Sequence, residues 1–218
     1  RRSFRPADDS QRGLPHGRGE LLVKRASAFA RRQRGVSLIE VLITLFVLLV
    51  GLLGVAAMSL ASQRASMEGL QRHQALLLLN DMVSRINANR TVADCYAISA
   101  AGTGTPVFGV GSATLPSCAA GTIEAYSQAN ADLAEWDALL KGATVSTAAD
   151  ENVGAMIGAR GCVSRLATGR YLVSVVWQGL NATAAPSVGL NCGRNLYGQE
   201  ALRRAVSVPV QFADLRGS

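Results

Sequence analysis

One stretch decides the fold, residues 31–58, which read RRQRGVSLIEVLITLFVLLVGLLGVAAM. Its apolar part, residues 36–58, is 23 residues long and contains a single charged side chain, Glu40. A helix of that length reaches about 34 Å, which is enough to cross the hydrocarbon core of a bilayer. Three arginines lie just before it, and basic residues beside a membrane helix stay on the cytoplasmic side. The stretch therefore predicts a single-pass membrane segment with the N-terminus in the cytoplasm.

Glu40 is the unusual residue of this segment. A charged residue costs about 2.5–3.5 kcal/mol in the middle of a membrane helix and less near its ends, and such residues usually have a function and a partner. No basic residue lies within 36–58. A cut after Gly35 would create a new α-amino group on Val36, which could pair with Glu40 of a neighbouring copy. Such a pair would set the register of packed copies, since leaving either charge unpaired is costly.

The positive charge of the chain is concentrated before this segment. Residues 1–35 hold ten Lys or Arg and three acids, whereas residues 36–218 hold twelve of each kind. Nucleic-acid binding depends on Lys and Arg contacts to phosphate. Removal of residues 1–35 as a leader would leave a neutral chain, so we expect no nucleic acid among its partners.

Beyond the membrane segment the pattern predicts that the helix continues. From Ser59 to Asn89 there is no Pro and one Gly, and apolar residues recur at helical spacing. We expect one helix from about 36 to 89, with a membrane half (36–58) and an amphipathic half (59–90). Gly51 and Gly54 are places where it could bend.

Residues 91–218 are expected to form a globular domain outside the cytoplasm. Residues 99–122 read as loop, and residues 126–140 as a short amphipathic helix that buries Leu133, Trp136 and Leu140. Strands are predicted at 205–212 and near 161–167. A further strand is predicted at 171–178, where the residues alternate, with Ser174 on the polar face and four side chains on the apolar face: Tyr171, Val173, Val175 and Trp177. Pro209 cannot donate a backbone hydrogen bond, so the strand at 205–212 is expected at a sheet edge or at a bulge. The fold class is therefore α+β, a long helix with a small antiparallel sheet.

The domain has four cysteines, Cys95, Cys118, Cys162 and Cys192. No two have CxxC spacing and neither histidine lies near one, so a zinc site is not expected. An even number in an exported domain indicates two disulfides. Four cysteines allow three connectivities, of which we favour the sequential one, Cys95–Cys118 and Cys162–Cys192. No metal or cofactor is expected.

The N-terminal motif resembles the signal shared by type IV pilins and type II secretion pseudopilins. Gly35, Val36, Leu38, Ile39 and Glu40 carry the resemblance, although the family usually has Phe at the position of Val36. It implies that prepilin peptidase cuts after Gly35 and methylates the new amine of Val36. It also implies a pilin-like fold, with the helix packed on a C-terminal sheet, and an assembly role for Glu40.

Four further strings resemble the minor pilins of type IV pili: residues 80–90, 133–140, 171–179 and 190–208. This resemblance implies a low-abundance subunit that primes pilus assembly near the tip. Its partners would be the major pilin, other minor pilins, a tip adhesin and inner-membrane lipid before it reaches the cell surface. A type II secretion pseudopilin remains the alternative, and a DNA-uptake pilin is disfavoured by the neutral mature chain.

Other polar residues give weak signals. The solvent-exposed face of the short helix is expected to carry Asp132, Glu135 and Asp137. The solvated start of the last strand, or a contact with a partner, is expected to involve Arg203 and Arg204. No Ser/His/Asp or Cys/His set suggests an enzyme.

Overall fold

The computed structural model describes residues 35–112, 117–143 and 156–212. The chain divides into two compact units, Arg1–Leu49 and Val50–Ser218, and each is considered by itself. In the first unit, residues 35–37 are irregular and lead into helix α1, Leu38–Ala88, which ends in the second unit.

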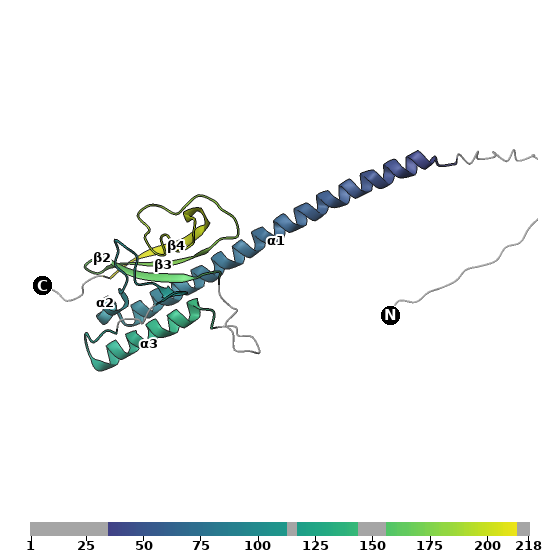
Figure 1. The fold of residues 1–218 in the computed structure, drawn as a ribbon. Coiled ribbons are helices and arrows are strands. Elements are labelled where there is room, and N and C mark those ends of the chain that lie inside the picture. Colours follow the sequence, from purple (N-terminus) through teal and green to yellow (C-terminus); the bar gives the residue numbers. More distant parts are fainter. Residues whose placement is uncertain (1–34, 113–116, 144–155, 213–218) are drawn as a thin grey trace, which may run out of the picture. The chain divides into compact units, whose positions relative to one another are not determined.

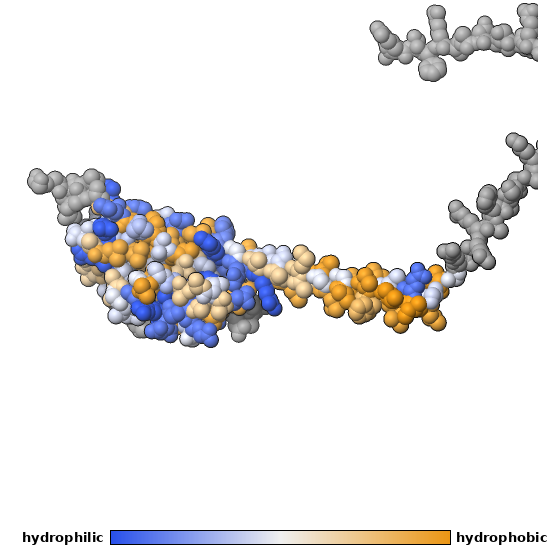
Figure 2. All heavy atoms as spheres, turned by 90° about the horizontal axis from the view of Figure 1, so that it is seen from above, coloured by the Kyte–Doolittle hydropathy of each residue, from blue (hydrophilic) through white to orange (hydrophobic). Residues whose placement is uncertain are grey.

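Helix α1 begins at Leu38 because the carbonyl of Ser37 accepts hydrogen bonds from the amides of Glu40 and Val41 (2.9 and 3.2 Å). The helix continues through Gly51 and Gly54. Every residue from 35 to 67 is exposed within the described chain. Apolar side chains (orange in Figure 2) cover the visible face of the N-terminal part of this helix. The helix is long and apolar enough to cross a membrane, and its apolar window is not buried against the protein.

The second unit contains one four-stranded antiparallel sheet in the order β1-β2-β3-β4. Its strands are β1 (Phe108–Gly109), β2 (Arg160–Ala167), β3 (Arg170–Gln178) and β4 (Arg203–Gln211). In the central register Val173 pairs with Val163 on one side and with Val208 on the other. β4 lies at an edge, where the missing amide of Pro209 is tolerated.

The second half of α1 and helix α3 (Ile123–Leu140) pack on the same face of the sheet (Figure 1). Thr122 caps α3 by accepting a hydrogen bond from the amide of Ala125. The inner face of β3 supplies the alternating side chains predicted for it, all buried: Tyr171, Val173, Val175 and Trp177. From the helices, the core takes Ala75, Leu79, Met82, Ile86, Leu133, Trp136 and Leu140.

The opposite face of the sheet is also partly covered. Val176 and Cys162 form a second apolar cluster with Val107, Cys192 and Tyr197. The segment between β3 and β4 supplies two of these residues, and it folds back over the strands that precede it. Ser174, predicted on the polar face, is therefore only 1% exposed.

Some short elements were not predicted. β1 lies inside the segment expected to be loop, and two short helices follow α1: η1 (Arg90–Val92) and α2 (Ala93–Tyr96). A third, η2 (Glu200–Leu202), precedes β4. In α1 the apolar run 75–79 is only partly buried, because Leu76 and Leu77 are exposed. The architecture is the predicted α+β arrangement.

Candidate functional site

The N-terminal segment brings together the residues singled out by the sequence. Gly35 and Val36 precede α1 and are exposed, and Glu40 lies exposed in the first helical turn. A carboxylate there is favoured by the partial positive charge of the helix N-terminus. A Cβ on Gly35 would meet nothing within 4 Å, and its backbone does not have a positive φ. The fold itself therefore does not require glycine at position 35.

Residues 30–56 match the family described as the prokaryotic N-terminal methylation motif. The segment is similar to a prepilin N-terminus. This match supports a type IV pilin-like protein, and it suggests a structural rather than a catalytic role. The prepilin-like segment and the apolar helix that follows fit membrane anchoring. No curated protein and no solved structure matched the chain.

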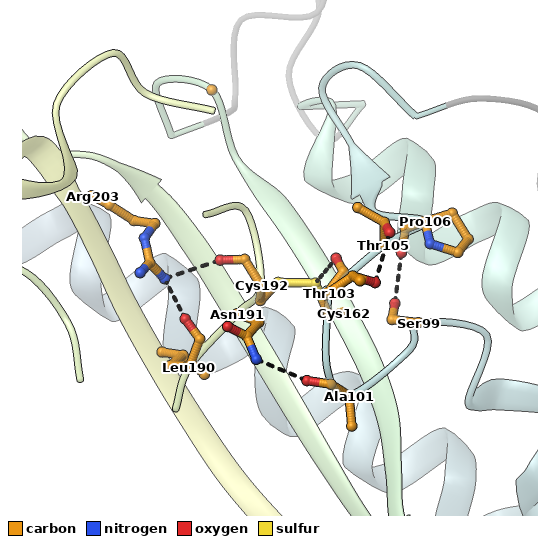
Figure 3. Close-up of a disulfide and its surroundings, with 12 residues drawn as sticks. Ser99, Ala101, Thr103, Thr105, Pro106, Cys162, Leu190, Asn191, Cys192 and Arg203 are labelled. Atoms are coloured by element: carbon orange, nitrogen blue, oxygen red, sulfur yellow. Dashed lines mark hydrogen bonds between the residues drawn. A yellow bond between two sulfur atoms is a disulfide. The ribbon is translucent and has the colours of Figure 1, made fainter. Parts of the chain in front are cut away.

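The cysteines form two disulfides, Cys95–Cys118 and Cys162–Cys192, which is the sequential pairing favoured from the sequence. The first joins α2 to the segment before α3. The second joins β2 to the segment between β3 and β4, where Asn191 also donates a hydrogen bond to the carbonyl of Ala101 (Figure 3). The second disulfide fixes this segment over the outer face of the sheet.

Arg203 holds the same segment from the other side, and the expectation of a solvated strand entry is wrong for it. The side chain is 2% exposed. Its Nη1 donates to the carbonyls of Leu190 (2.9 Å) and Cys192 (3.0 Å), as Figure 3 shows. Its Nε and Nη2 donate to Glu200 Oε2. Burial alone would raise the pKa of Glu200, but hydrogen bonds from the Asn195 amide and from Arg203 outweigh it and lower the pKa.

The prediction that Asp132 is solvent-exposed is also wrong, since this residue of α3 is buried on the side that faces Arg85 of α1. Its Oδ1 accepts from Arg85 Nη1 (3.1 Å) and Gln128, and its Oδ2 accepts from the Tyr96 hydroxyl (2.5 Å). Burial, and secondly this hydrogen bond, raise the pKa of Tyr96 well above its ordinary value. Glu135 is exposed as expected but pairs with Arg85 (2.8 Å), which lowers the pKa of that carboxyl.

Asp137 is the second buried acid of α3. It accepts a hydrogen bond from the amide of Gly109 in β1 (2.6 Å) and pairs with Lys141. Asp132 and Asp137 each adjoin a residue of the apolar stripe, Leu133 and Trp136. That adjacency was the available signal that they lie at the edge of the buried face. In the part of the chain that the structure describes, no group of His, Cys, Asp and Glu is arranged to hold a metal ion.

Proposed function

We propose that the protein is a minor pilin that primes assembly of a type IV pilus and becomes part of it near the tip. In this proposal prepilin peptidase removes residues 1–35 and methylates the amine of Val36. Residues 36–58 then anchor the protein in the inner membrane, and residues 59–90 carry the globular domain, 91–218. In the assembled pilus, Glu40 pairs with the terminal amine of a neighbouring subunit.

The observation that carries the proposal is the coincidence at the start of α1. The methylation motif covers residues 30–56, the helix begins three residues after Gly35, and Glu40 lies in its first turn. Because the fold places no demand on Gly35, a requirement for glycine there would come from an enzyme that recognises it. The described chain gives Glu40 no basic partner, so the amine created by the cut is its natural counter-ion.

The finer assignment rests on resemblance. The strings at 80–90, 133–140, 171–179 and 190–208 resemble the type IV pilus modification protein PilV. This supports a tip-proximal position beside other minor pilins and an adhesin, with the major pilin below. The surface that such a pilus would touch is not specified by any of these strings.

The test replaces Gly35 and Glu40 in the host. Gly35→Ala should block cleavage, and Glu40→Gln should allow cleavage but block incorporation into pili and twitching motility. Two matched controls are available: Gly51→Ala, a helix glycine with open space around it, and Glu124→Gln, an exposed acid in the first turn of α3.

N-terminal sequencing of the mature protein should begin at Val36. Surface pili counted by electron microscopy and enzymes released by type II secretion separate the pilin from the pseudopilin. Normal pili and motility in both site variants would contradict the proposal. A defect in type II secretion without a defect in pili would instead show that the protein is a pseudopilin.

A further inference from the structure

A hollow of about 260 Å³ with both charged and apolar lining residues opens in the second unit, where α1 passes the end of the sheet. It is lined by Glu68, Gly69, Arg72, Trp177 and Arg204, and is called here the Arg72 notch. Glu68, Gly69 and Arg72 come from α1, and Trp177 and Arg204 face each other across the β3–β4 pair. The prepilin-like segment contributes nothing to it.

Arg204 is fixed at the notch by the backbone. Its guanidinium donates to the carbonyls of Ala201 (3.0 Å) and Asn181 (2.5 Å). Its Nη2 lies 3.8 Å from Glu68 Oε1, which is an ion pair but too long for a hydrogen bond. Glu68 Oε1 is buried and has no hydrogen-bond partner among the described residues. The positive charge of Arg204 is therefore only loosely compensated.

Arg72 adds a second positive charge, which no described residue neutralises. It is exposed, and within residues 35–112, 117–143 and 156–212 it makes no side-chain hydrogen bond or ion pair. The notch thus holds two guanidinium groups and one carboxylate, an excess of one positive charge. Guanidinium groups recognise carboxylates by paired hydrogen bonds. Trp177 offers an apolar wall against which the methylene groups of an acidic side chain can lie.

The position of the notch along α1 favours a protein over a lipid headgroup as its ligand. Glu68 lies ten residues beyond Met58, the end of the apolar run, so it is about 15 Å further along the helix axis. A headgroup layer adds only about 5–8 Å on each side of the hydrocarbon core. We propose that the Arg72 notch binds the carboxylate of an Asp or Glu side chain from a neighbouring subunit. This deepens the proposed function and rests on it, since the partner is another pilus subunit.

The test places a photoreactive phenylalanine analogue at position 69 of the full chain in host cells. A side chain there has open space, because a Cβ on Gly69 meets nothing within 4 Å. The expected adduct joins position 69 to a subunit peptide that carries Asp or Glu. Adding Arg72→Glu should reduce the adduct at least about tenfold, because like charges would then face each other. Arg72→Lys should preserve most of it.

Two controls make the result specific. Arg64→Glu changes the same charge on the same helix outside the notch and should leave the adduct unchanged, and the probe at Gln74 should not give it. An adduct that survives Arg72→Glu, one to phospholipid, or one to a peptide without an acid would each overturn the proposal, as would no adduct. N-terminal sequencing in the same cells reports the proposed function separately, since it reads cleavage at Val36 whatever position 69 contacts.

Discussion

The two halves of α1 differ in how their apolar side chains are covered, although they form one continuous helix. From 38 to 67 every residue is exposed within the described chain, although most are apolar. From 71 onward a single stripe is buried, made of Gln71, Ala75, Leu79, Met82 and Ile86. The second half is stabilised by contacts with the sheet and α3, whereas residues 38–67 are not buried against any part of the chain that the structure describes.

This difference teaches that apolar content does not by itself identify a core. The most apolar part of the sequence contributes nothing to the folded domain. The core of the domain is instead built from one stripe of α1, the inward side chains of α3 and the inner face of a small sheet, with a smaller apolar cluster on the outer face. Substitutions in the second half should therefore change the free energy of unfolding of the domain, whereas substitutions in the first half should not.

The largest expected effect comes from Trp136→Ala. Trp136 is fully buried, lies edge-on to Phe108 (5.1 Å between ring centroids) and donates a hydrogen bond to the carbonyl of Leu78 (2.9 Å). We expect a loss of about 3–5 kcal/mol in the free energy of unfolding of the domain. Pulse proteolysis of the full chain in detergent across a urea series measures it. Leu53→Ala, in the exposed half, is the control and should leave this value unchanged; equal losses would break the comparison.

A smaller effect is expected from removing the disulfide that fixes the outer segment. The double change Cys162→Ser and Cys192→Ser opens a loop closed over a sequence separation of 30 residues. Chain entropy predicts a loss of about 3–4 kcal/mol, reduced where Arg203 still holds the segment. Hydrogen exchange should rise first at residues 179–200 and least along the buried stripe of α1. Uniform exchange over the whole domain would show that the two faces of the sheet are not separable.

What could be predicted from the sequence depended on the range of the signal. The 3.6-residue period of α1 and the alternation in β3 are local, and both elements were found. β1 contains two residues, Phe108–Gly109, in a stretch rich in small residues, so no period could reveal it. The burial of Asp132 depends on Arg85, 47 residues away, and that of Arg203 on carbonyls at the end of a folded-back segment. Distant partners of this kind leave no local pattern.

The site shows the same limit. The motif at 35–40 is contiguous and was readable directly. The Arg72 notch was not, because it joins residues 68–72 to Trp177 and Arg204, whose proximity arises only in the folded domain. Arg204 was singled out as a possible partner contact, but nothing in the sequence linked it to α1.

The smallest expected effect is a loss of domain stability at alkaline pH, which arises from the folded domain and not from the exposed half of α1. Burial, and secondly a hydrogen bond to Asp94 Oδ1 (2.8 Å), raise the pKa of Tyr171 to about 12. The pKa of Tyr96 is raised in the same direction. A raised tyrosine pKa contributes stability that is present below the unfolded value near 10 and is lost as the pH rises through the folded value.

We therefore expect domain stability to fall between about pH 10 and 12. Urea unfolding of the full chain at stepped pH, with tyrosinate absorbance, measures it. Tyr171→Phe should flatten part of the slope. A stability curve that is level across this window would contradict the assignment.

The exposed first half of α1 finally limits where the protein can exist. Its large apolar side chains each gain about 1.5–3 kcal/mol on leaving water, so together they amount to tens of kcal/mol. That exceeds the 5–15 kcal/mol that holds a typical domain together. Exposure of this half of the helix to water is therefore strongly unfavourable. For a chain anchored in a bilayer, removal of the helix from the lipid would be favourable only where another apolar surface covers the same side chains.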